Sequence, residues 1–302
     1  MKYRYQLGKR RYETAQTAAA AVLLLPTLVA LGFLFLYPVI RLFSLSFTST
    51  NTITNQSTWI GMKNYTYLIK NEIFRKAFGN TWAFTAVKLV AEIAISLLLA
   101  VLLDMRIPWR KYLRVSYFAP VIVPVVASSI IWMWLYDPVL GPLNQALRLL
   151  GLSGSNYIYA ESSALMSIVA FAVWRGIGYD IIIFISGLQG ISDSVVEAAR
   201  IDGAGEWQIF TRVKLPLLRP IVMFVVMMGL IGCFQAFTEV DIMTGGGPNN
   251  STLLMVNYIY SQAFGNAKLG RGAAASVLLF IVIFLLTLLQ KVMSDRKERQ
   301  DG

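Results

Sequence analysis

Long apolar stretches with few charges alternate with short polar segments along most of the chain. The hydrocarbon core of a bilayer is about 30 Å thick, and a helix needs about 20 apolar residues to cross it. Stretches of this length are expected as spans at about 14–40, 80–103, 115–136, 162–191, 220–238 and 272–290. Segments of about ten residues with alternating polarity, which would indicate a membrane barrel, do not occur in the sequence. The pattern therefore predicts an all-α integral membrane protein with six transmembrane helices.

The first apolar stretch follows a basic segment and could be confused with a secretory signal. Its charge-free run from Thr14 to Ile40 is longer than the apolar part of a signal peptide. Further spans follow it. We therefore expect this stretch to remain uncleaved as the first span.

The composition agrees with a membrane protein and removes several classes of site. Apolar residues make up 56% of the chain and charged residues 14%. The charged share is well below that of an ordinary soluble domain, in which about a quarter of the residues are charged. The mean hydropathy is +0.59. There is no histidine, and Cys233 is the single cysteine. The sequence therefore excludes an internal disulfide framework, histidine-based zinc sites and a Ser-His-Asp triad.

The distribution of basic residues predicts the orientation. Segments 1–13, 104–114, 191–219 and 291–302 together carry 17 Lys and Arg, whereas the loops between the opposite ends carry 7. Because basic loops stay in the cytoplasm, both termini are expected there. The net charge of +11 is explained in the same way, without a nucleic-acid partner. The expected organisation is a cytoplasmic tail at 1–13, a six-helix transmembrane domain at 14–293 and a second cytoplasmic tail at 294–302.

The cytoplasmic loop 192–219 has the pattern of two short helices. Ser194 and Glu197 have the spacing of a capping box, which predicts the start of the first helix. Gly203 can take the positive φ of a turn, and a second helix is expected from Glu206 to Arg212. A helix pair this small cannot bury its own apolar face, so it needs a groove on another protein.

This loop resembles the EAA loop of binding-protein-dependent ABC importers. Glu197-Ala198-Ala199, Gly203, Val213 and Leu215-Pro216 have the residue types and the spacing of that motif. The resemblance implies a role in coupling to an ATPase for these residues: Glu197, Ala198, Ala199, Asp202, Gly203, Leu215 and Pro216.

Two further segments resemble the carbohydrate class of these permeases, of the maltose/glycerol-phosphate type. The first runs from Thr244 to Pro248 and is followed by Ser251-Thr252. The second runs from Gly61 to Tyr65, with Asn80-Thr81 after it. The resemblance implies uptake of a sugar or oligosaccharide that an extracytoplasmic binding protein delivers. It also implies a second, different permease, two ATPase subunits and the cytoplasmic membrane of a bacterium or archaeon.

The nucleotide is expected on a partner chain. The Walker A sequence GxxxxGK[ST] is absent from this sequence. We therefore expect ATP and Mg²⁺ on the ATPase subunits, no cofactor in this chain and no enzymatic activity of its own.

Charges and aromatic residues inside the spans are the candidates for function, because they are costly in lipid. Lys88 and Glu92 are four residues apart and are expected to form an ion pair. Arg175 and Asp180 are five apart, a poor helical spacing, and are expected to find other partners.

The family resemblance implies sugar contacts for Trp174, Gly176 and Tyr179 in the fourth span. Gly176 and Gly178 would leave room for a ligand to approach the backbone. Gln235, near the outer end of the fifth span, is the expected hydrogen-bonding partner on that side. For Glu239 and Asp241, which follow it, solvation at the interface is the simpler expectation.

Two other classes of function compete with an importer permease. A secondary transporter would explain the charges in the second and fourth spans, because such proteins bind ions at broken helices. A membrane enzyme, such as a lipid-linked glycosyltransferase, would need converging carboxylates or a metal site. Neither class explains the spacing of the EAA-like segment.

The topology predicts which positions a reagent can reach from outside the cell. In a Cys233→Ser background, single cysteines at Asn55 or Asn250 should react in intact cells with a membrane-impermeant maleimide. A cysteine at Ser294 should react only after the cells are permeabilised. The reverse labelling pattern would contradict the orientation.

Overall fold

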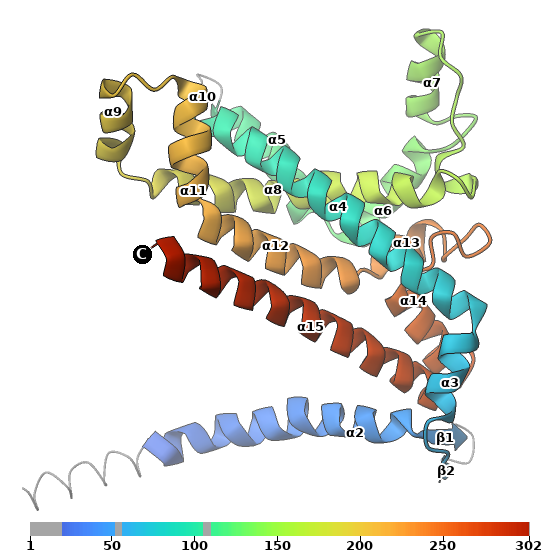
Figure 1. Ribbon diagram of the computed structural model, residues 1–302. Helices are drawn as coiled ribbons and strands as arrows, with labels where there is room; N and C mark the ends of the chain where they lie inside the picture. The colour runs from blue at the N-terminus through green and yellow to red at the C-terminus, as the bar shows by residue number, and fades with distance from the viewer. Residues whose placement is uncertain (1–19, 52–55, 105–109, 302) are drawn as a thin grey trace, which may run out of the picture.

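The computed structural model describes residues 20–51, 56–104 and 110–301, so the expected tail at 1–13 lies outside the described residues. The described part of the chain is mostly helical (Figure 1). The long helices are Ala20–Ser46, which contains η1 (Gly32–Leu36) and α2 (Tyr37–Ser46), and α4 (Glu72–Asp104), α8 (Ala164–Gln189), α12 (Arg219–Phe234) and α15 (Leu269–Asp301). The strands β1 (Thr48–Asn51) and β2 (Gln56–Trp59) form an antiparallel hairpin.

The shorter helices connect or prolong the long ones. They are α3 (Lys63–Lys70), α5 (Arg110–Ile122), α6 (Val125–Leu135), α7 (Pro142–Leu149), η2 (Tyr157–Tyr159), α9 (Asp193–Ile201), α10 (Glu206–Ile209), η3 (Phe210–Lys214), α11 (Leu215–Leu217), α13 (Thr238–Met243), α14 (Met255–Tyr260) and η4 (Ser261–Gly265).

Four helices are long and apolar enough to cross a membrane, and up to six if each of two bent helix pairs forms one span. The expected second and sixth stretches lie within α4 and α15, and α8 covers the expected fourth stretch except for two residues at each end. Of these, α4 and α15 are longer than the stretches expected at 80–103 and 272–290, since polar residues prolong both helices beyond the apolar core.

The third expected span, 115–136, is not one helix. It divides into α5 and α6, which are bent by 111°. Proline explains the break, because it has no N–H to donate and disfavours helical backbone at the residue before it. Pro124 stands directly before α6 with φ −53° and ψ 135°, outside the helical range. Charge and apolarity could not reveal this bend.

The fifth expected span, 220–238, is shorter than the sequence indicated. The helix α12 has 16 residues and ends at Phe234. At 1.5 Å per residue it covers about 24 Å, less than the hydrocarbon core. The chain leaves the helix at Gln235 and starts again in α13, so the span ends partway through the expected stretch.

Gly176 and Gly178 in α8 allow neighbouring helices to approach closely. A Cβ at Gly178 would meet the carbonyl oxygen of Tyr117 in α5 and would lie 2.8 Å from Cγ2 of Val121. A Cβ at Gly176 would overlap the carboxylate of Glu92 in α4. The expectation that Gly178 gives space to a ligand is therefore corrected, because α5 occupies that space, whereas Gly176 contacts Glu92 and also borders a cavity.

Residues of the carbohydrate-class segments hold the loops at one end of the bundle. Nδ2 of Asn80 donates to the carbonyl oxygens of Asn250 and Leu253, at 2.9 and 3.1 Å. The backbone N–H of Met255 donates to Oγ1 of Thr81, at 2.9 Å. These side chains satisfy backbone groups that a loop cannot pair by itself.

A polar cluster closes the same end. Nζ of Lys76 lies 3.1 Å from Glu161 and 2.7 Å from the carbonyl oxygen of Asn249. The ammonium of Lys76 and the amide of Asn249 together hold the pKa of the Glu161 carboxyl below its ordinary value. The cluster joins α4, the segment before α8 and the loop after α13.

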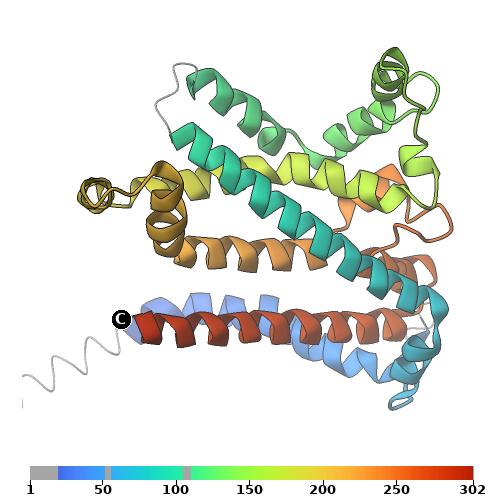
Figure 2. The ribbon, with the colours of Figure 1, turned by 45° about the horizontal axis from the view of Figure 1, so that its top comes forward.

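The two ends of the bundle differ in what they present (Figures 1 and 2). One end carries α9 and α10, and both the C-terminal end of α15 and the first described turn of the chain lie on that side. The opposite end carries the β-hairpin, α3, α7 and the loop after α13.

The close approach at Gly178 gives a stability prediction. Gly178→Ala should lower the melting temperature of the detergent-purified protein by several degrees, because α5 must move away from α8. Gly79→Ala is the matched control, since a Cβ there meets nothing within 4 Å and alanine favours the helix. Equal melting temperatures for the two variants would contradict this account of the packing.

Candidate functional site

The expected coupling residues lie on the α9–α10 helix pair and on α11 after it. Gly203 forms the turn with φ +84°, as the sequence predicted. The N–H of Gly203 donates to the carbonyl oxygen of Arg200, and that of Ala204 donates to Ala199, both at 3.0 Å. These bonds close the C-terminal end of α9 and direct the chain into α10.

The expected capping box at Ser194 and Glu197 does not form. Helix α9 begins at Asp193, so Ser194 lies inside its first turn and Ser192 takes the N-cap position. The hydroxyl of Ser194 bonds to the hydroxyl of Ser192 at 2.7 Å. A residue within the first turn has helical backbone and cannot cap the helix as an extended residue does.

The two helices of the loop are tied together by one ion pair. Nη2 and Nε of Arg200 lie 2.8 and 3.2 Å from Oε1 of Glu206. Both side chains are solvent-exposed, so the bond sets geometry more than it adds stability.

Apolar side chains on this pair are exposed. Ile201 is 86% exposed and Trp207 75% exposed, while Val195 also faces solvent. No residue of α9 is buried. The pair therefore presents an apolar surface with no cover in this chain's described residues, as the sequence predicted.

Leu215 and Pro216 lie in α11, where the chain bends by 65° from the loop helices into α12. Just before them, Nζ of Lys214 lies 3.7 Å from Asp104 at the end of α4. Just after them, Leu218 is buried in a cluster with Ala100 and Leu188. The segment that contains Leu215 and Pro216 is thereby attached to α4 and α8, and it leads directly into α12.

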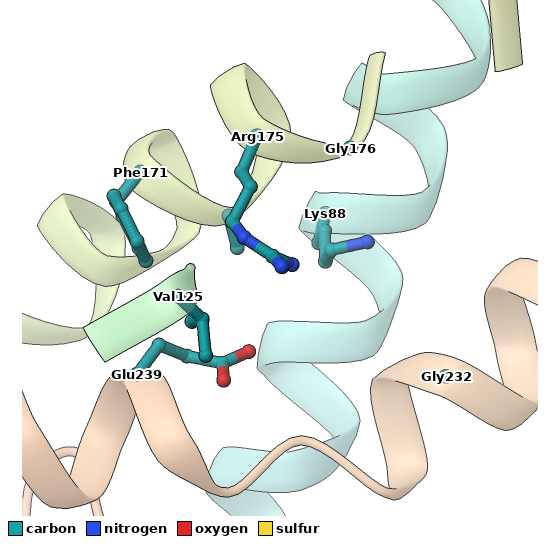
Figure 3. Close-up of a pocket in the computed structure, with 8 residues that line it drawn as sticks. Lys88, Val125, Phe171, Arg175, Gly176, Gly232 and Glu239 are labelled. Carbon is teal, nitrogen blue, oxygen red and sulfur yellow. The ribbon is translucent and has the colours of Figure 1, made fainter. Parts of the chain in front are cut away.

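A second candidate region is a cavity of about 200 Å³ inside the bundle (Figure 3). It lies among α4, α6, α8, α12 and α13. The lining residues are Lys88, Val125, Phe171, Ala172, Arg175, Gly176, Gly232 and Glu239.

The charged groups at the cavity differ in their partners. Lys88 forms the expected ion pair with Glu92 within α4. Nε of Arg175 is buried and has no hydrogen-bond partner among the described residues. In Figure 3 the Arg175 guanidinium and the Glu239 carboxylate both point into the cavity, from α8 and α13. The expectation of interfacial solvation is thus corrected for Glu239, because the start of α13 turns this half-buried side chain inward.

The residues expected to contact sugar are placed differently from one another. Gly176 lines the cavity. Trp174 packs in an aromatic cluster, with ring centroids 5.2 Å from Trp132 and 6.2 Å from Phe171. Tyr179 is 53% exposed, and Gln235 lies on the surface at the end of α12. Of these residues, the structure brings Gly176 alone to the cavity wall.

Sequence reasoning gave too little weight to Arg175 and Glu239. The intramembrane charge was a signal for Arg175. Nothing in the sequence indicated that the short helix α13 would turn Glu239 inward, because this depends on where α12 ends.

The chain is similar over most of its length to transport permeases. The sn-glycerol-3-phosphate transport system permease protein UgpA of Yersinia pseudotuberculosis is 31% identical, over 92% of this chain and 95% of the relative. The multiple sugar-binding transport system permease protein MsmF of Streptococcus mutans is 33% identical, over 91% and 94%. The arabinooligosaccharides transport system permease protein AraP of Bacillus subtilis is 31% identical, over 96% and 92%.

A solved structure has the same fold. It is that of a bacterial ABC transporter involved in the import of the acidic polysaccharide alginate, and the match has a TM-score of 0.84. The sequence identity is 21%, and the match covers 95% of this chain and 99% of the other. Residues 92–299 match the family described as binding-protein-dependent transport system inner membrane component. The chain thus belongs to this family of inner membrane transport components, and it is a permease subunit of the ABC importer type.

Proposed function

We propose that this chain is one of two permeases in an ABC importer for a sugar or oligosaccharide. An extracytoplasmic binding protein delivers the sugar, a second, different permease completes the path, and two ATPase subunits hydrolyse ATP bound with Mg²⁺. Transport relatives named for glycerol phosphate, multiple sugars and arabinooligosaccharides support the substrate class.

The proposed topology has six spans with both termini in the cytoplasm of a bacterium or archaeon. It counts α5 with α6 as one span and α12, without the loop helices that precede it, as another. The C-terminal end of α15 lies on the same side as α9 and α10 (Figure 2), which fits a cytoplasmic C-terminus beside the ATPase. The excess of Lys and Arg in the segments at that side supports the same orientation.

The observation that carries the proposal is the exposed apolar surface of the α9–α10 pair, at residues with the EAA spacing. Ile201 and Trp207 project from two short helices that the Arg200–Glu206 ion pair holds together. A groove on an ATPase would cover this surface, since exposed aromatic side chains on a small helix are typical anchors of an interface.

The coupling residues then transmit the motion of the ATPase. Gly203 sets the angle between the helices, and Leu215 and Pro216 begin the bend into α12. A displacement of the pair reaches α12 and, through Lys214 and Asp104, the end of α4. Ion-coupled secondary transport, the competing function, gives no role to this surface.

For the sugar path we propose Trp174, Gly176, Tyr179 and Gln235 as candidate contacts. Gly176 borders the cavity in this conformation. Tyr179 and Gln235 are exposed in the isolated chain and would reach sugar at the face shared with the second permease.

The turn at Gly203 gives a test of coupling. Gly203→Val should lower sugar uptake roughly tenfold or more, because a β-branched residue at this positive φ costs about 1–3 kcal/mol and changes the angle of the pair. Gly205→Ala is the control, since Gly205 has φ −72° and a Cβ there meets nothing within 4 Å. Uptake is measured at matched membrane levels. Wild-type uptake by Gly203→Val would show that the loop is a passive linker.

The apolar surface gives a test of the partners. Affinity purification of the chain from its own host should recover an ATPase and a second permease. Trp207→Glu should lose the ATPase and keep the second permease, because a buried charge in a groove costs binding energy. Trp59→Glu is the control, since Trp59 is 69% exposed at the opposite end of the bundle. Recovery of the ATPase by both variants would contradict the proposed contact.

A further inference from the structure

The cavity lies halfway along two of the long apolar helices. Lys88 is in the middle of α4, Glu72–Asp104, and Gly176 is in the middle of α8, Ala164–Gln189. The other walls come from interrupted helices, with Val125 directly after the break before α6 and Gly232 near the end of α12. Interrupted backbone at this depth is tolerated where it lines a cavity or is buried in protein.

The charges that face the cavity balance each other. Lys88 is neutralised by Glu92 on the next turn of the same helix. Arg175 and Glu239 remain, one cation and one anion, and both point into the cavity (Figure 3). No ion pair joins them in the described part of the chain. The cavity therefore offers strong donors and a strong acceptor without an excess of either charge.

The Arg175 guanidinium lacks a hydrogen-bond partner at Nε in the described part of the chain, and a ligand can supply one. Its Nε is buried and makes no hydrogen bond with the described residues. An unpaired buried N–H is costly, more so on a charged group. A hydroxyl group, which both accepts and donates, would satisfy the guanidinium with its lone pair and the Glu239 carboxylate with its proton.

We propose that this cavity binds one ring of an uncharged sugar. Arg175 donates to its hydroxyl oxygens, Glu239 accepts from its hydroxyl groups, and Phe171 covers an apolar part of the ring. The inference rests on the proposed function and narrows its substrate class to neutral sugars. The cavity holds about 200 Å³. Because sites for drug-sized ligands are larger than this, the cavity favours one ring at a time.

The Glu239 carboxylate, which lines the same cavity as Arg175, disfavours the binding of an anionic sugar. A carboxylate or phosphate near Arg175 would also lie near the Glu239 carboxylate, and like charges repel strongly in a medium of low dielectric constant. Glu239 is thereby the residue that determines specificity against acidic sugars.

Uptake of neutral sugars and of anionic compounds by the complete importer tests the substrate class. The importer with its binding protein is placed in proteoliposomes and supplied with labelled maltose, raffinose, arabinobiose, glucuronate, digalacturonate and glycerol 3-phosphate. We expect ATP-dependent uptake of at least one neutral sugar and none of the anionic compounds. Uptake of an anionic compound at the rate of the best neutral sugar would overturn the inference and leave the proposed function intact. Background uptake of every compound would overturn the proposed function itself.

Variants of Arg175 and Glu239 then test whether these residues bind sugar, and the assay uses the neutral sugar that the wild-type importer transports. Arg175→Gln and Glu239→Gln should each lower the sugar moved per ATP roughly tenfold or more, since each variant removes a hydrogen bond to a charged group, the stronger kind of hydrogen bond. Assembly of the complex and ATP hydrolysis stimulated by the binding protein should persist, which separates sugar binding from misfolding. Asp241→Asn is the matched control, because Asp241 is exposed on the same short helix and does not line the cavity.

The double variant separates sugar binding from an ion pair that closes the cavity. If both residues bind sugar, Arg175→Gln/Glu239→Gln should transport no better than either single variant. Recovery to the wild-type ratio of sugar to ATP would show that the two residues serve each other, and would overturn the inference. Wild-type ratios in both single variants would overturn it as well.

Discussion

Hydrocarbon cannot hydrogen-bond a peptide group, so each backbone interruption inside the membrane must be covered by protein. This constraint explains why most of the chain is in continuous helices. It also requires protein to cover the backbone at two interruptions, which lie between Ile122 and Val125 and between Phe234 and Thr238. At the second, the amide of Asn257 donates to the carbonyl oxygen of Phe237 at 3.2 Å. The cavity borders both interruptions, so the least regular backbone and the intramembrane charges occur together.

The same constraint determines how charges are held within the bundle. Lys88 and Glu92 neutralise each other on one helix, and the absence of a Cβ at Gly176 leaves space for the Glu92 carboxylate. A larger residue at that position would displace the ion pair. Close helix packing and charge neutralisation therefore depend on each other, and they leave Arg175 as the cation directed into open space.

The α9–α10 helix pair and the cavity are connected through one continuous stretch of chain. The loop helices lead through η3 and α11 directly into α12. The buried side chain of Leu218 packs against α4 and α8 at the near end of α12, and Gly232 borders the cavity at its far end. A movement of the loop helices thus has a short mechanical path to the cavity wall.

Apolar run lengths, charge placement and the spacing of Glu197, Gly203 and Pro216 determined the membrane class, the helical fold and the two-helix loop. These are properties of local segments, because each run must satisfy its own backbone and Gly203 takes its positive φ within a single turn. The break before α6 has a local cause in Pro124, although run lengths and charge do not reveal it. The early end of α12 and the inward direction of Glu239 were decided by tertiary structure. They depend on which helix packs against which residue, as Gly178 does against α5, and a sequence does not state the distance between two helices.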